Sequence, residues 1–235
     1  MYEMMFKKYV LALFTLLIST VGFSQSEYQI RQAIDFFNAN KLQSGDWKLT
    51  QSDIEGSPYL NDEFMEGVVF TTSKTQYMGM PLRYNIFNDQ VEFKAQEQVQ
   101  AIAAPETIEK IEMGDIKLVY APYSLSKKIR RGYFIVEEEG VASLYRKPEI
   151  MFEEAKEPGA YKEAEPAQFK RKSDSYFIRI GKSPAQLVAS KKDLEEAFPN
   201  HQKEIKQYIK DEKVKPRKEE TLPGLIQFYN SLVSN

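Results

Sequence analysis

Arg83 and Asn85 are the first polar side chains of this chain that could bind a ligand, because they interrupt its most regular apolar pattern. The stretch PLRYNIFNDQVEFK, residues 81–94, alternates apolar and polar residues on both sides of Asn88 and Asp89, which predicts a β-hairpin. Exposed cross-strand polar pairs are ordinary in sheets. A place on a solvated sheet face is therefore favoured over a ligand site for both residues.

The register of this hairpin follows from its turn. A two-residue turn places Asn85 opposite Glu92, and it places Arg83 opposite Lys94 with Glu92 as a diagonal neighbour. A turn two residues longer would change the partners and keep the faces, because side chains alternate with a period of two. In either register the polar residues share one face, and Tyr84 lies on the opposite, apolar face.

The densest basic cluster consists of Lys127, Lys128, Arg130 and Arg131. Four cations within five residues could bind a phosphate, a lipid headgroup or an acidic glycan. The alternative is a solvated loop before the predicted strand at 132–138, and this interpretation is favoured. Aromatic residues do not interleave with the cations, so the cluster does not resemble a single-strand nucleic-acid site, and no nucleic-acid partner is expected.

Catalytic motifs are incomplete throughout the sequence. His201 is the only histidine, so a catalytic triad would have to use it, and its strongly polar segment favours a surface residue instead. The same count excludes metal sites that need two or more histidines, and cysteine is absent. Ser124 and Lys127 have the spacing of a serine nucleophile and its lysine base, but the partner motifs are missing. We therefore assign no catalytic residue, no metal ligand and no cofactor.

Carboxylates are the remaining route to catalysis. Asp62, Glu63 and Glu66 cluster after a turn, and paired carboxylates can serve as the acid and base of a glycoside hydrolase. A solvated acidic patch is the commoner explanation. A catalytic pair from distant positions would form only in the folded chain, so a hydrolase remains an alternative.

The first residues predict export. Lys7 and Lys8 precede an apolar run at 9–23, and small and polar residues follow, which is the pattern of a signal peptide over 1–24. We expect cleavage between Ser24 and Gln25, with contact to the membrane only transiently through this leader. The mature chain would be periplasmic or secreted. The alternative is an uncleaved leader that anchors the chain in the inner membrane.

The remaining sequence divides into a helical segment at 25–46, a β-rich domain at 47–189 and a helical segment at 190–235. A stripe of apolar residues at helical spacing predicts a helix at 27–38, and Ser190 with Asp193 predicts a helix start. The charged stretch 153–172 is interpreted as a loop. Alternation predicts strands near 66–72, 81–87, 90–95, 98–102, 108–113, 116–120, 132–138, 142–152, 175–181 and 185–188.

These elements predict an α+β fold, in which a mostly antiparallel twisted sheet or partial β-barrel carries C-terminal helices packed on it. The stretches GSPYLNDEFMEGVVF (56–70) and MPLRYNIFNDQVEF (80–93) resemble an opening found in uncharacterised exported β-rich proteins of Gram-negative bacteria. The resemblance implies export and a β-then-helix layout. It implies no substrate, cofactor or catalytic residue.

Together these observations favour a non-enzymatic binding or envelope-assembly module. The expected partners are an apolar small molecule held in the mouth of the curled sheet, a lipid or an envelope protein. The formal net charge of −2 gives no electrostatic reason for a nucleic-acid partner. The alternatives are a carboxylate-dependent hydrolase of glycan or peptide and a membrane-anchored structural protein.

Overall fold

The computed structural model describes residues 54–95, 98–158 and 163–234 of the 235-residue chain. The predicted leader, its cleavage between Ser24 and Gln25, and the predicted helix at 27–38 lie outside this part. The strands are β1 (Glu55–Gly56), β2 (Met65–Thr71), β3 (Gln76–Asn85), β4 (Gln90–Ala95), β5 (Gln98–Ala101), β6 (Ile108–Met113), β7 (Ile116–Leu125), β8 (Lys128–Glu138), β9 (Ala142–Lys147), β10 (Ile150–Glu153), β11 (Gln168–Arg171), β12 (Ser175–Ile180) and β13 (Ala185–Leu187).

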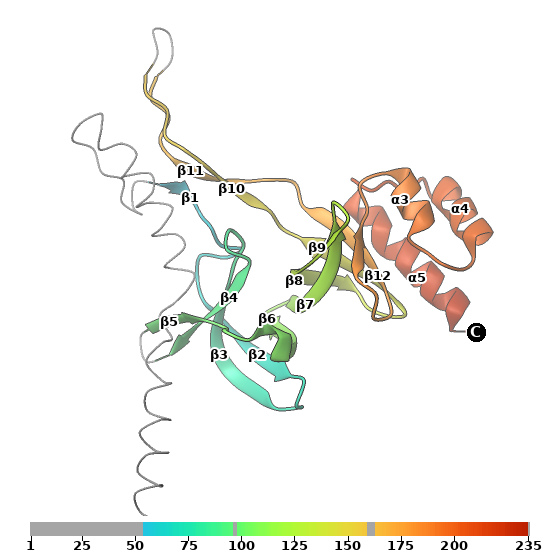
Figure 1. Cartoon of the computed structure of the whole chain (residues 1–235), viewed down its shortest axis with the longest axis horizontal. Helices are drawn as coiled ribbons and strands as arrows, with labels where there is room; N and C mark the ends of the chain where they lie inside the picture. Colours follow the sequence, from blue (N-terminus) through green and yellow to red (C-terminus); the bar gives the residue numbers. More distant parts are fainter. Residues whose placement is uncertain (1–53, 96–97, 159–162, 235) are drawn as a thin grey trace, which may run out of the picture.

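The helices come mainly at the C-terminal end, to the right in Figure 1. They are η2 (Pro105–Thr107), α3 (Lys191–Glu196), α4 (Gln202–Asp211), η3 (Glu219–Thr221) and α5 (Leu222–Val233), of which η2 and η3 are single 3-10 turns. Among the described residues, no helix is both long and apolar enough to cross a membrane.

Ten strands form one sheet in the order β13-β12-β9-β8-β7-β6-β2-β3-β4-β5. β13 also pairs in parallel with β7, so β7, β8, β9, β12 and β13 close into a five-stranded barrel. The strands from β6 to β5 extend this barrel as an open antiparallel sheet (Figure 1). The predicted α+β class and mostly antiparallel sheet are confirmed, and the barrel part is closed.

Side chains fill the interior of the barrel. Phe134 and Phe177 lie 5.2 Å apart between ring centroids, and Tyr123 lies 5.5 Å from Phe177. Ala121 and Ala185 are fully buried beside these rings. Because a five-stranded barrel is narrow, a few aromatic rings occupy its interior, which is where an apolar ligand was expected to enter.

The described part of the stretch 153–172, predicted as a loop, is a strand only at its two ends, at Glu153 and at 168–171. β10, which ends at Glu153, pairs antiparallel with β11, and Lys156 and Glu165 continue the pairing as an isolated bridge, so that the two strands form a projecting arm (Figure 1). Phe152 and Phe87 both pack against Phe169, at 5.5 and 5.2 Å between ring centroids. The apolar positions are few and are separated by charged residues, so the alternation is hard to detect in the sequence.

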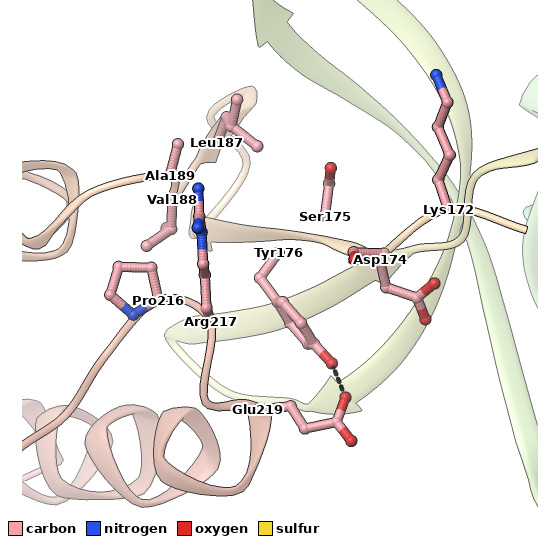
Figure 2. A pocket seen from close by; sticks show the side chains of 11 residues that line it. Lys172, Asp174, Ser175, Tyr176, Leu187, Val188, Ala189, Pro216, Arg217 and Glu219 are labelled. Carbon is pink, nitrogen blue, oxygen red and sulfur yellow. Dashed lines mark hydrogen bonds between the residues drawn. The ribbon is translucent and has the colours of Figure 1, made fainter.

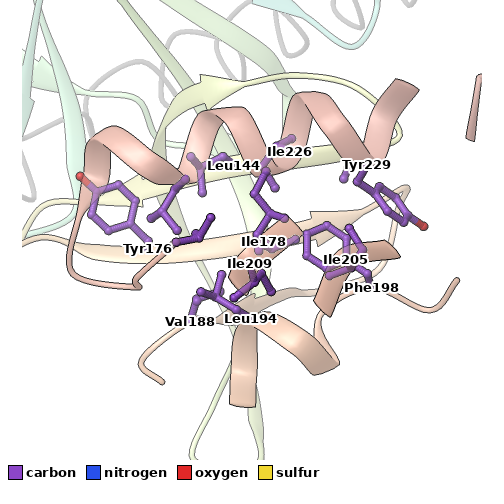
Figure 3. Packing of buried hydrophobic residues seen from close by; sticks show 14 residues of the cluster. Leu144, Tyr176, Ile178, Val188, Leu194, Phe198, Ile205, Ile209, Ile226 and Tyr229 are labelled. Atoms are coloured by element: carbon purple, nitrogen blue, oxygen red, sulfur yellow. The ribbon is translucent and has the colours of Figure 1, made fainter. Parts of the chain in front are cut away.

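The C-terminal helices pack on the outer side of β9 and β12. Figure 3 shows Leu144, Tyr176 and Ile178 of these strands meeting the apolar side chains of the helices. The side chain of Asn230 on α5 accepts from the N–H of Ala142 at 2.8 Å and donates to its carbonyl at 2.9 Å. The helical segment is therefore held to the barrel by an apolar cluster and by these two hydrogen bonds.

Two local features of this region depend on single residues. Ser190 and Asp193 form a capping box at the start of α3, as predicted. Gly140, in the turn between β8 and β9, fits the turn pattern of the sequence but does not adopt a left-handed conformation. Its Cβ, if present, would lie 2.2 Å from Asn230 Nδ2, so the close approach of α5 explains the glycine.

One mouth of the barrel lies where β9 ends at Lys147. The next residue, Pro148, has no N–H group, so the backbone of Tyr133 on β8 lacks a strand partner there. Asp89, in the β3–β4 turn, accepts from the Tyr133 N–H at 3.2 Å, and Lys147 Nζ donates to the Tyr133 carbonyl at 3.0 Å. Two side chains thus replace the missing strand.

Asp89 and Lys147 also bind each other across this mouth. Their carboxylate and ammonium groups are 2.8 Å apart, and the Tyr84 hydroxyl donates to the same carboxylate at 2.7 Å. Gly132 provides the space, because a Cβ there would lie 2.4 Å from Asp89 Oδ2 and 2.9 Å from Lys147 Nζ. The tip of the β3–β4 hairpin therefore seals the barrel and joins it to the open sheet.

Candidate functional site

Arg83 and Asn85 lie on β3 in a register two residues away from the two-residue-turn prediction. Arg83 is directly opposite Glu92, and Asn85 is opposite Gln90. The turn has the longer form, and the faces are unchanged, as the period-two argument requires. The predicted pairing of Arg83 with Lys94 is therefore wrong, and the favourable cross-strand ion pair replaces it.

The solvated face expected for these residues is also wrong. Asn85 and Glu92 are fully buried. Glu92 accepts from Arg83 at 2.9 Å and from Asn85 at 3.0 Å. The segment 57–64 runs beside the end of β3, where Tyr59 forms a β-bridge with Asn85.

Arg83 ties the segment 57–64 to the sheet. Its guanidinium carbon lies 3.5 Å from the ring centroid of Tyr59 and 4.4 Å from that of Phe64, and it donates to the carbonyl of Asp62 at 3.0 Å. Buried charges are tolerated when they are paired and hydrogen-bonded. Arg83 and Asn85 are thus engaged in holding the fold.

The basic cluster lies at the tip of the β7–β8 hairpin. The predicted loop before 132–138 is wrong, because β7 and β8 both continue to a turn at Ser126 and Lys127. These two residues have φ of 50° and 63°, which is the left-handed pair required by the commonest two-residue hairpin turn. Lys127, Lys128, Arg130 and Arg131 are all exposed.

A cleft of about 710 Å³ opens between the start of β12 and the segment that precedes α5. A second hollow of about 540 Å³ adjoins it, and the two share Asp174, Tyr176 and Glu219. Figure 2 shows the Tyr176 hydroxyl directed at Glu219, which it contacts at 2.5 Å. This hydrogen bond joins the barrel to the helical segment across the floor of the cleft.

The carboxylates of the cleft already have cationic or hydroxyl partners. Asp174 accepts from Arg146 at 2.8 Å and from Arg171 at 2.6 Å. Burial, and then the hydrogen bond to Glu219, raise the pKa of the Tyr176 hydroxyl. Tyr176 therefore stays protonated at neutral pH and acts as a donor to Glu219, not as a nucleophile.

Two cations of the cleft have no such partner. Lys172 and Arg217 are exposed, and neither forms an ion pair with a described carboxylate. Figure 2 shows Arg217 beside Val188 and Ala189, with Lys172 on the other side of Asp174. The cleft thus offers positive charge next to an apolar wall, which suits an anionic group on a partly apolar ligand.

The sequence did not indicate this cleft. Lys172 ends a charged stretch that is typical of a loop. Arg217 lies in a charged run that is typical of a solvated helix face. Only packing of α5 on β9 brings the two within one cleft. The sequence features that could have indicated the cleft are few: the apolar residue Val188, and Pro216 next to cationic residues.

The other sequence candidates remain apart from the cleft. His201 precedes α4 and lies 3.9 Å from Glu204, and Asp62 accepts a hydrogen bond from Ser57 in the segment that covers Arg83. Within the described ranges, no three potential metal ligands gather in one place. Comparison with protein-family models, with curated proteins and with solved structures finds no match to this chain.

Proposed function

We propose that this chain is an exported, non-enzymatic binding module, and that its ligand enters the cleft between β12 and the segment before α5. The observation that carries the proposal is the cleft of about 710 Å³ in which Lys172 and Arg217 form no ion pair with a described carboxylate. An open volume of this size accommodates a small molecule or a short chain segment.

The chemistry of the walls supports an anionic ligand with an apolar part. Leu187, Val188 and Pro216 supply apolar surface beside Arg217, and a guanidinium group binds carboxylate or phosphate in two-pronged geometry. This ligand class replaces the apolar molecule in the barrel mouth, because aromatic side chains fill the barrel and Asp89 with Lys147 seals one of its mouths.

Native mass spectrometry of the protein isolated from the envelope of its host tests the proposal. We expect a chain that starts at Gln25 and carries an extra non-covalent mass. Replacing Lys172 and Arg217 by glutamate should remove that mass, because the two cations provide the attraction. The matched control, Lys203→Glu with Lys210→Glu on the exposed face of α4, should retain it.

The outcomes separate the alternatives. A bare chain, or an extra mass that survives the cleft substitutions, would contradict binding in the cleft. A mass that retains residues 1–24 would contradict release and support the membrane-anchored structural protein.

The hydrolase alternative has one observation in its favour. Asp174 and Glu219 line the same cleft, and paired carboxylates across a cleft are what glycoside hydrolysis requires. Turnover of glycan or peptide substrates by the purified protein, lost on Asp174→Asn and on Glu219→Gln, would favour it over the binding module. Equal background rates in the unchanged protein and in both variants would exclude the hydrolase.

A further inference from the structure

We propose that the tip of the β7–β8 hairpin, residues 125–131, binds the surface of an anionic lipid bilayer. The site is separate from the cleft and does not depend on it. It would give the exported chain a reversible contact with the membrane in addition to its predicted transient contact through the leader.

The tip is the end of the β7–β8 hairpin, and only its last cross-strand pair, Leu125 with Lys128, lies beyond both neighbouring strands. β8 pairs with β9 only from Ile135 onward, and β7 pairs with β13 only at Tyr123 and Ser124. Beyond these points the hairpin continues to the pair Leu125 and Lys128 with no further strand beside it. A two-residue turn then closes it, so its side chains are presented on a defined scaffold.

The charge of this hairpin contrasts with that of the whole chain. From residue 116 to residue 136 there is no Asp or Glu, whereas the chain as a whole has a formal charge of −2. Four of the cations in this stretch, Lys127, Lys128, Arg130 and Arg131, lie at the tip and form no ion pair with a described carboxylate. Unneutralised cations at one hairpin tip attract an anionic surface.

Ile129 distinguishes a bilayer from other anionic partners. Its side chain is 62% exposed, and it lies between Lys128 and Arg130. Binding of a free phosphate or an acidic glycan gives no use for an exposed isoleucine at the centre of the cations. A bilayer does, because an apolar side chain can enter the interface while the adjacent long cationic side chains contact the headgroups.

The two faces of the hairpin are both suited to this contact. Directly opposed residues share a face, so Lys128 lies with Leu125, and Ile129 lies with Ser124 on the other side. Cations and apolar side chains therefore occur on both faces of the tip. Insertion of the tip end-on would bring all of them to the headgroup region.

Sedimentation with lipid vesicles tests the proposal on the purified protein in its exported form. We expect binding to vesicles that contain phosphatidylglycerol, weakening with salt, and no binding to vesicles of phosphatidylcholine alone. Each cation near an anionic bilayer changes partitioning by about fivefold. Lys128→Gln combined with Arg131→Gln should thus weaken binding by roughly 25-fold.

Two further variants make the result specific. Ile129→Ser should weaken binding at high salt as well as at low salt, because its contribution is apolar. Lys203→Gln with Lys210→Gln removes the same charge from α4 and should bind like the unchanged protein. All of these side chains are exposed, and their unfolding midpoints should match that of the unchanged protein.

Three results would overturn the proposal. They are an absence of binding to phosphatidylglycerol vesicles, an equal loss in the α4 control, and displacement by soluble glycerol phosphate at matched ionic strength without any effect of Ile129→Ser. The last of these would indicate a soluble-anion site in place of a membrane contact.

Discussion

Arg83 and the cations of the β7–β8 tip are alike in the sequence, since each lies in or beside a strand next to a turn, but the fold places them in opposite surroundings. Arg83 has a side chain that is 15% exposed, an ion pair to a fully buried Glu92 and two aromatic rings against it. Lys128 and Arg131 are exposed and form no ion pair with a described carboxylate.

The comparison shows what decides whether a cation in an alternating strand stabilises the fold or is available for binding. Arg83 has a structural role because the register of the hairpin places the carboxylate of Glu92 directly opposite it. A stretch without carboxylates left the tip cations available. Removal of Arg83 should therefore cost stability, and removal of a tip cation should cost only binding.

Arg83→Ala is expected to have the largest effect. It leaves the buried Glu92 carboxylate without its guanidinium partner, and breaking a buried ion pair in this way costs about 3–5 kcal/mol. Urea unfolding of the variant and the unchanged protein measures the difference. A loss below about 1 kcal/mol would mean that Arg83 is dispensable and that the comparison with the tip fails.

The second-largest effect is expected from alkaline pH, which should destabilise the fold through the buried tyrosines Tyr84 and Tyr133. Burial, and then Asp89, raise the pKa values of Tyr84 and Tyr133. Their contribution to stability is therefore complete below the unfolded pKa, about 10, and is lost as the pH rises above it. We expect the urea midpoint to fall over the same pH range in which the tyrosinate absorbance rises.

Tyr133→Phe serves as the control for that pH effect. The Tyr133 hydroxyl is buried and has no hydrogen-bond partner among the described residues. Its removal should leave stability at neutral pH unchanged or raise it by about 1 kcal/mol, and should reduce the alkaline loss. A large loss at neutral pH would contradict the described position of this hydroxyl.

Gly132→Ala should cost about 1–3 kcal/mol, because the new methyl group would overlap the Asp89 and Lys147 side chains at the barrel mouth. Chemical unfolding of this variant, of Asp89→Ala and of the double variant forms a thermodynamic cycle. We expect the alanine to cost less once the Asp89 carboxylate is gone. Strict additivity would contradict the contact between the hairpin tip and the barrel.

Lys127→Gly should stabilise the chain by up to about 1 kcal/mol, because glycine adopts the left-handed conformation of Lys127 without the Cβ penalty. Thermal unfolding measures the gain. Vesicle binding should fall in the same variant, since a tip cation is lost. A destabilised variant would show that the Lys127 side chain contributes contacts to the fold.

Arg131→Ala should change the free energy of unfolding by no more than about 0.5 kcal/mol, as is usual for an exposed side chain without specific contacts. The same urea titration used for Arg83→Ala applies. A cost approaching that of Arg83→Ala would show that the two cations are not in different surroundings.

Several features followed from local sequence alone. Alternation located most strands to within a few residues, and period-two parity predicted the faces of the hairpin even though its turn was longer than the simplest case. The capping box of Ser190 and Asp193 was also evident, because its chemistry lies within four residues. Period and cap are properties of neighbouring residues, so no tertiary contact is needed to recognise them.

Tertiary structure decided the rest. The parallel pairing of β13 with β7 closes the barrel, the segment 57–64 places Tyr59 and Phe64 against Arg83, and the segment before α5 forms the cleft with β12, with Lys172 and Arg217 on its walls. Each of these joins parts of the chain that are distant in sequence. Neither burial nor charge pairing is encoded in the spacing of nearby residues, because each depends on which distant surface covers the side chain.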